Sequence, residues 1–110
     1  MRAPAARLAQ AAPLFAALGD ETRLTLVSRL SGQGPQSIAR LTEGTRVSRQ
    51  AITKHLLALA EAGLVESTRE GRERIWELRP KRLAEASRYL EQISDQWDDA
   101  LGRLRAFVER

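Results

Sequence analysis

The sequence of 110 residues contains no cysteine, and this absence excludes disulfides, thiolate metal sites, cysteine nucleophiles and thiol redox sensing. Histidine is nearly absent too, and His55 alone is too few for a histidine-based zinc or copper site within one chain. No apolar run approaches the length of a transmembrane helix. We therefore expect a soluble, cytoplasmic protein with no metal site, no cofactor and no membrane partner.

The N-terminal segment imitates a secretory signal in part, because two arginines precede the alanine- and leucine-rich residues 8–18. A glutamine and a proline interrupt that run. Its large apolar residues, Leu8, Phe15 and Leu18, fall at the spacing of one helical face. We interpret the segment as an amphipathic helix.

Basic residues outnumber acidic ones by 18 to 14, which gives a net charge of +4. The excess lies in residues 1–82, with 14 basic and 8 acidic groups, whereas residues 83–110 carry 4 and 6. Arginine supplies all but two of the basic groups, and its planar guanidinium suits bidentate contacts to phosphate and guanine. This asymmetry favours a polyanionic partner, although a GC-rich genome would produce the same arginine bias.

Apolar periodicity predicts four helices in the first part of the chain, over residues 5–18, 21–30, a short segment starting at Pro35, and 48–62. Asp20 and Ser48 are the expected N-caps, and Gly63 is the expected left-handed residue after the fourth helix. The expected inward side chains of the last three helices are Leu24, Val27, Leu30, Ile38, Leu41, Ile52, Leu56 and Leu59.

Two strand-like runs, 64–68 and 72–78, flank a Glu-Gly pair and predict a hairpin. The pattern is helical again over residues 81–108, where apolar residues recur every three or four positions. A helix that lies on a compact domain usually needs a shorter apolar stripe than this one. We therefore expect the stripe to pack against a second copy of the protein rather than within the same chain. Its members are Ala86, Leu90, Ile93, Trp97, Leu101, Leu104 and Val108.

Short helices, a turn, a longer capped helix and a basic hairpin make a mainly α fold: a winged helix-turn-helix with a two-stranded antiparallel β-wing and long N- and C-terminal helices. One α-helix fits the major groove of B-DNA. When the apolar face of helix 48–62 is turned inward, four polar side chains remain on its outward face: Arg49, Gln50, Thr53 and Lys54. These residue types suit contacts to bases and phosphates. The alternative is that they form an ordinary solvent-exposed helix face.

Further candidate DNA contacts flank that helix. Ser48 lies at an N-terminus whose free N–H groups favour phosphate, and Arg46 adds charge beside it. The hairpin supplies Arg69, Arg72 and Arg74 for the sugar-phosphate backbone or the minor groove, unless neighbouring glutamates neutralise them. Leu57 falls on the outward face, where it either contacts a thymine methyl or is covered by the hairpin.

Several motifs are similar to those of one family. Residues 17–24 (ALGDETRL) resemble its "ALADPTRLRIL" opening, and residues 48–56 (SRQAITKHL) resemble "SQSTVSRHL". Residues 59–65 (LAEAGLV) and 69–72 (REGR) resemble its "LREAGLV" and "REGR" segments. From about residue 14 to residue 80, the chain resembles the ArsR/SmtB family of winged-helix transcriptional repressors.

The resemblance implies a dimer whose first and last helices form the interface, with recognition helices in successive major grooves about 10 base pairs apart. The interface would contain Leu8 and Phe15 together with the C-terminal stripe. Metal sensing is not expected, because the family's cysteine or His–Asp ligands are missing and Asp95, Asp98 and Asp99 are interpreted as a solvated face. The resemblance also includes the family's "HL" histidine at His55, which we interpret as bonded to a neighbour rather than as a pH switch.

We therefore expect one winged-helix domain over residues 1–110, with dimerisation helices at 1–18 and 81–110, the helix-turn-helix at 35–62 and the wing at 64–79. The expected function is that of a dimeric, sequence-specific DNA-binding regulator, a repressor whose partners are double-stranded DNA and a second copy. An enzyme is not expected, because no nucleophile–base pair or nucleotide site can be assembled. The alternative is a winged-helix protein-interaction module without DNA binding. The sequence leaves open whether a small-molecule effector, a protein or neither of these releases the repressor from DNA.

Overall fold

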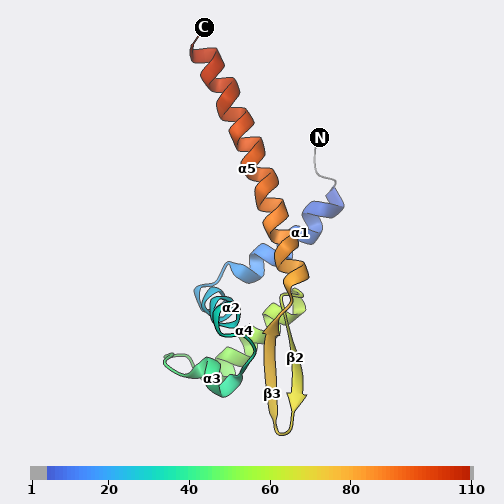
Figure 1. Ribbon diagram of the computed structural model, residues 1–110, viewed down its shortest axis with the longest axis vertical. Coiled ribbons are helices and arrows are strands. Elements are labelled where there is room, and N and C mark those ends of the chain that lie inside the picture. Colours follow the sequence, from blue (N-terminus) through green and yellow to red (C-terminus); the bar gives the residue numbers. More distant parts are fainter. Residues whose placement is uncertain (1–4, 110) are drawn as a thin grey trace.

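The computed structural model describes the backbone of residues 5–109 and the side chains of residues 9–109. Figure 1 shows a bundle of short helices beside a β-hairpin, with one long helix projecting away from both. The mainly α winged-helix prediction is confirmed. The elements are α1 (Ala5–Leu18), α2 (Glu21–Gln33), β1 (Gln36–Ser37), α3 (Ile38–Thr42), α4 (Arg49–Glu61), β2 (Val65–Glu70), β3 (Glu73–Leu78) and α5 (Pro80–Val108).

Side-chain caps begin the short helices. The carboxylate of Asp20 accepts a hydrogen bond from the backbone N–H of Arg23 at 3.0 Å, and the hydroxyl of Ser48 accepts one from Ala51 at 3.1 Å. Gly63 follows α4 with a φ of +79°, a left-handed conformation that glycine adopts without strain. These three predictions are confirmed.

The boundary between α2 and α3 differs from the prediction. The second helix continues to Gln33, and the third does not begin at Pro35. Instead Ser37 is its N-cap, its hydroxyl accepting a hydrogen bond from the backbone N–H of Arg40. Between the two helices, Gln36 and Ser37 form β1, because their backbone groups pair with β3.

The sheet has three antiparallel strands in the order β1-β3-β2, so the predicted two-stranded wing has an additional short strand. Gln36 lies opposite Trp76 and Ser37 lies opposite Ile75. A two-residue strand is too short to show an alternating pattern, and only pairing with β3 makes it recognisable.

The core lies where α1, α2, α3 and α4 meet the sheet and the start of α5. The predicted inward face of α4 is confirmed, because Ile52, Leu56 and Leu59 are fully buried. On α2, Leu24 is 51% exposed and Leu26 is buried in its place. This helix carries apolar residues on more than one face, and its packing against α4 and β3 selects the face that contains Leu26.

Two other predictions about faces need correction. The first helix buries Leu14 and Ala17, while Phe15 and Leu18 pack only partly against the core. Ala86, which we expected at a subunit interface, is only 4% exposed because it packs into the core of its own chain. The described stretch of chain contains no helix long and apolar enough to cross a membrane.

Candidate nucleic-acid interface

The outward face of α4 is where the sequence predicted it. Arg49, Gln50 and Lys54 are exposed, and Thr53 is half-buried. The hydroxyl of Thr53 donates a hydrogen bond to the carbonyl of Arg49 at 2.9 Å, so its proton is already used. What Thr53 offers a ligand is therefore its methyl group and an acceptor lone pair.

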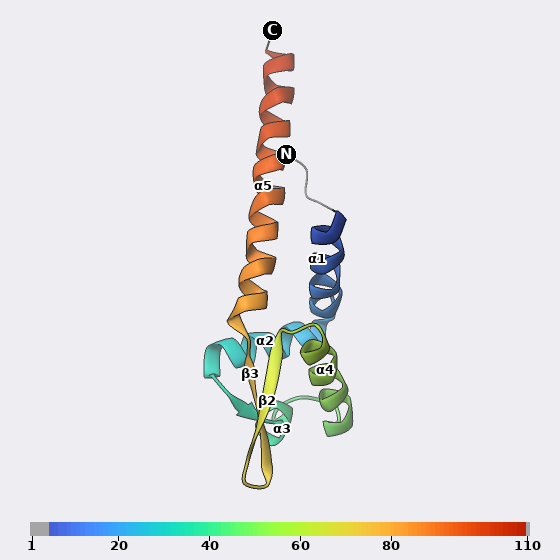
Figure 2. The same ribbon diagram turned by 90° about the vertical axis from the view of Figure 1, so that its right-hand side faces the viewer.

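This face of α4 and the tip of the wing border a common hollow of about 670 Å³. Both lie at the end of the molecule opposite the free end of α5 (Figure 2). The hollow brings together four α4 residues, two wing arginines and the start of α3, although these segments are distant in sequence. Its lining is Ser37, Ile38, Ala39, Arg49, Gln50, Thr53, Lys54, Arg72, Glu73 and Arg74.

The strand register separates the charges of the wing by face. Arg69 lies opposite Arg74 and Glu70 lies opposite Glu73, and residues directly opposite each other share a face. Side chains two residues apart on a strand point to the same face, so Arg74 and its partner Arg69 share a face with the buried Trp76. Glu70 and Glu73 are on the opposite face of the two strands. Like charges directly opposite each other repel, and an anion between the two guanidinium groups would relieve this repulsion.

The alternative that Glu70 and Glu73 neutralise the wing arginines has no ion pair to support it. Within the described residues, the ion pairs join His55 with Asp20, Arg79 with Glu66, and Arg82 with Glu85. Arg74 is instead held by a neutral partner, since its guanidinium donates to the hydroxyl of Ser67 at 3.0 Å.

The remaining predicted contacts surround this hollow without lining it. Arg46 is exposed in the loop before α4, and Ser48 is exposed at the N-terminus of that helix. Leu57 lies farther along α4 and is 55% exposed, so the hairpin does not cover it. Glu61 follows one turn later on the same outward face, and its negative charge marks the end of the surface that suits a polyanion.

Arg29 is a positioning residue that the sequence pattern did not reveal. Its guanidinium donates to the carbonyls of Leu41 and Arg40, both at 2.8 Å, and to that of Glu43 at 3.3 Å. These carbonyls end α3 and begin the loop to α4, where regular helical hydrogen bonds end and only Arg40 among the three accepts one from a capping N–H, that of Glu43. Arg29 therefore fixes the turn of the helix-turn-helix from α2, and no local signal in the sequence marks that role.

The C-terminal stripe is exposed over most of its length. Trp97 is 64% exposed and Val108 is 72% exposed, and Leu90, Ile93, Leu101 and Leu104 are exposed with them. Phe15 of α1 packs against Tyr89 of α5, with ring centroids 5.9 Å apart. The side chain of Leu8 lies outside the described residues. Asp95, Asp98 and Asp99 are exposed, and the described residues contain no cluster of three or more potential metal ligands.

Comparisons with known proteins match this geometry. Residues 18–68 match the model of a family described as a helix-turn-helix domain. The solved structure of an ArsR-like transcriptional regulator from Rhodococcus sp. RHA1 is similar over 91% of this chain and 93% of that one, with 42% identity and a TM-score of 0.76. The chain belongs to the ArsR family of winged-helix transcriptional regulators.

Two further proteins resemble this ArsR-family chain. The uncharacterised HTH-type transcriptional regulator YuzN of Bacillus subtilis is 40% identical over an alignment of 68 residues, and the match covers 56% of this chain and 74% of the relative. The homodimeric winged helix-turn-helix DNA-binding domain of Mb0332 from Mycobacterium bovis is 26% identical, with a TM-score of 0.64, over 90% of this chain and 88% of that one. The family and its members identify the chain as a DNA-binding transcriptional regulator.

Proposed function

We propose that two copies of the chain pair through α5 and α1, and that the pair recognises a specific duplex sequence with α4 in the major groove. In this proposal the wing lies along the adjacent sugar-phosphate backbone, and occupancy of the site represses transcription. The observation that carries the proposal is the hollow that α4 and the wing share, lined by Arg49, Gln50, Lys54, Arg72 and Arg74.

The chemistry of this surface suits duplex DNA. Arginine can hold guanine O6 and N7 in a bidentate manner, and glutamine can hold adenine N6 and N7 in the same way. Lys54 and the wing arginines supply charge for phosphates. Glu70 is on the other face of the wing, and Glu73 is the one acidic residue among the four basic residues that line the hollow, so the charge of the lining is positive on balance.

The exposed stripe of α5 supports pairing with a second copy. The described parts of the chain leave Trp97 and its apolar neighbours uncovered, and the homodimeric domain from M. bovis has the same fold. A two-fold pair would present two α4 helices to half-sites about 10 base pairs apart.

Selection of bound fragments from a random duplex pool, followed by anisotropy titrations at two salt concentrations, tests this function. We expect a palindromic sequence, and tighter binding to the selected duplex than to a scrambled one by roughly 10³-fold or more. Absence of binding to any duplex at low salt would reject the proposal and favour a protein-interaction module.

The wing provides a prediction with a matched control. Replacing both Arg69 and Arg74 with serine is expected to weaken binding to the selected and scrambled duplexes alike. The slope of log affinity against log salt should flatten by about two units, because each lost phosphate contact removes about 0.9. Replacing Glu70 with serine, which is on the opposite face of the wing and does not line the hollow, should leave that slope unchanged. A loss confined to duplexes with A·T-rich flanks would place the arginines in the minor groove instead.

Leu57 leads to a second prediction, because an exposed leucine on this face can contact the methyl group of a thymine. Replacing that thymine with uracil removes only the methyl group, and should weaken binding of the natural chain about fourfold, the equivalent of ~0.8 kcal/mol. The variant Leu57→Ala should not distinguish the two duplexes. If every uracil substitution affects both proteins equally, Leu57 contacts no methyl group.

A further inference from the structure

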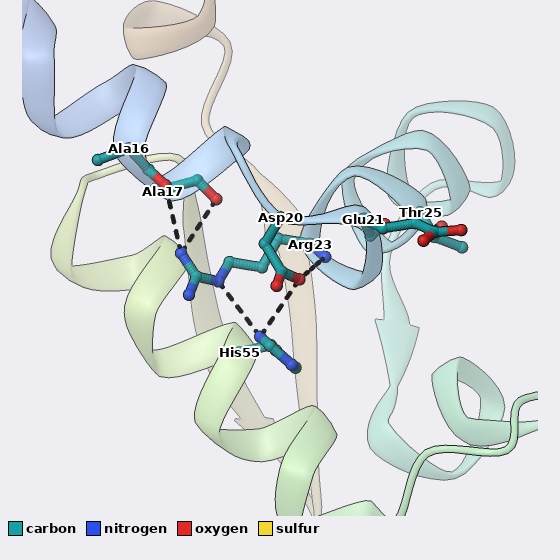
Figure 3. Close-up of polar contacts among 7 residues, drawn as sticks. All are labelled: Ala16, Ala17, Asp20, Glu21, Arg23, Thr25 and His55. Carbon is teal, nitrogen blue, oxygen red and sulfur yellow. Dashed lines mark hydrogen bonds and ion pairs between the residues drawn. The ribbon is translucent and has the colours of Figure 1, made fainter.

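The side chain of Arg23 joins three helices at one point (Figure 3). Its Nε donates a hydrogen bond to Nδ1 of His55 on α4 at 3.2 Å. Its Nη1 donates to the carbonyls of Ala17 and Ala16 at 3.2 and 3.5 Å. These carbonyls lie in the last turn of α1, where regular helical hydrogen bonds end and where Ala16 also accepts a turn hydrogen bond from the N–H of Gly19 at 3.3 Å. One guanidinium of α2 thus connects the end of α1 with the middle of α4.

This contact requires one form of the imidazole. Nδ1 of His55 can accept this hydrogen bond only in the neutral tautomer that carries its proton on Nε2. A proton on Nδ1 would meet the N–H of Arg23 instead of a lone pair. The same nitrogen lies 3.8 Å from the carboxylate of Asp20, which would attract the charged ring. The site therefore has two arrangements: a neutral ring held by Arg23, and a charged ring paired with Asp20.

The charged groups that face the ring are Arg23 of α2 and Asp20, the N-cap of that helix, while α1 contributes only carbonyl groups in the described part of the site. The backbone N–H of Arg23 donates to the Asp20 carboxylate and lowers its pKa below the ordinary value of 3.8. Asp20 therefore remains ionised at any pH at which histidine changes charge.

The position of His55 on α4 separates it from the DNA-facing surface. The ring points toward α2 and is 24% exposed, whereas the adjacent Lys54 is on the outward face. Nε and Nη1 of Arg23 belong to one planar guanidinium, so a tilt of α4 relative to α1 would lengthen or bend its hydrogen bonds to α1 or to His55. The angle of α4 and the neutral state of His55 are therefore linked.

On the basis of the proposed DNA-binding function, we propose that Arg23 and His55 form a positioning link that fixes α4 relative to α1, so that base reading requires the neutral form of His55. Because α1 belongs to the proposed subunit interface, this link also connects subunit pairing with the angle of the reading helix. The contact does not touch DNA. It acts through the placement of Arg49 and Gln50.

Three variants test this link by anisotropy, with the duplex selected by the natural chain and a scrambled duplex as probes. His55→Leu removes the acceptor, and Arg23→Lys removes the Nε donor. Each is expected to weaken binding to the selected duplex about tenfold, which is the size of effect expected when a hydrogen bond to a charged group is lost. Binding to the scrambled duplex should weaken less than about twofold. His55→Asn, which retains an acceptor near the position of Nδ1, should recover most of the affinity. Combining Arg23→Lys with His55→Leu should add little to either loss, because both remove the same contact.

A pH series on the natural chain supplies a readout that needs no substitution. Lowering the pH from about 8 to about 5.5, the range in which histidine changes charge, should weaken binding to the selected duplex, but not binding by His55→Asn. Added positive charge alone would strengthen binding to both duplexes, which is the opposite direction of change.

If the natural chain binds no duplex, the proposed function fails and this inference fails with it. If the natural chain discriminates but His55→Leu discriminates equally well, or loses both duplexes together with thermal stability, only the positioning link is overturned.

Discussion

Replacing Trp97 with glutamate is expected to convert the proposed dimer to a monomer and to weaken its binding to the selected duplex by about 10²–10⁴-fold. Trp97 is in the middle of the exposed stripe and is 64% exposed in the single chain. In a two-fold interface every substitution occurs twice, so two carboxylates would be buried in an apolar contact without partners. The loss of affinity follows because a monomer engages one half-site and loses the high effective concentration of the second reading helix.

Sedimentation velocity and anisotropy on the same samples check this result. Gln96→Glu is the matched control, because it adds the same charge to an exposed position about 100° around the helix from Trp97. The control should remain a dimer and bind DNA normally. A Trp97→Glu protein that sediments as a dimer and keeps its affinity would show that the stripe is not the interface.

Replacing Arg49 or Gln50 with alanine is expected to lower the discrimination between selected and scrambled duplexes by about 1–3 kcal/mol per lost base contact. Both side chains are exposed at the start of α4 and line the hollow beside the wing. Base contacts carry sequence information, so their loss should weaken the selected complex and leave the scrambled one nearly unchanged.

Lys54→Ala provides the contrasting control for base reading. Lysine contacts phosphate as a point charge, so its loss should weaken both complexes similarly and flatten the salt slope by about one unit. Anisotropy titrations of the three variants at several salt concentrations separate the two behaviours. Equal weakening of both duplexes by Arg49→Ala and Gln50→Ala would show that this helix does not read bases.

Elements with strong local patterns were predicted correctly. Ile52, Leu56 and Leu59 recur at helical spacing behind the cap Ser48, and the structure buries all three while leaving Arg49 and Gln50 outside. Such a pattern depends on residues within one segment. Chain neighbours alone therefore define the helix and its two faces.

Predictions failed where the outcome depends on a partner element. Leu24 and Leu26 are equally apolar, and the packing of α2 against α4 and β3 decides that only Leu26 is buried. Ala86 has the spacing of the exposed stripe, but the part of α5 nearest the domain packs into the core.

The sequence by itself determined the fold class, the caps of α2 and α4, the outward face of α4 and the apolar stripe of α5, because each depends on spacing and residue type over a few turns. Only the tertiary structure decided that Arg69 and Arg74 pair on one face of the wing strands, that the wing and α4 border one hollow, and that Arg23 and Arg29 bond the ends of other helices. These features join residues that are distant in the chain, and long-range contacts are defined only when the elements pack.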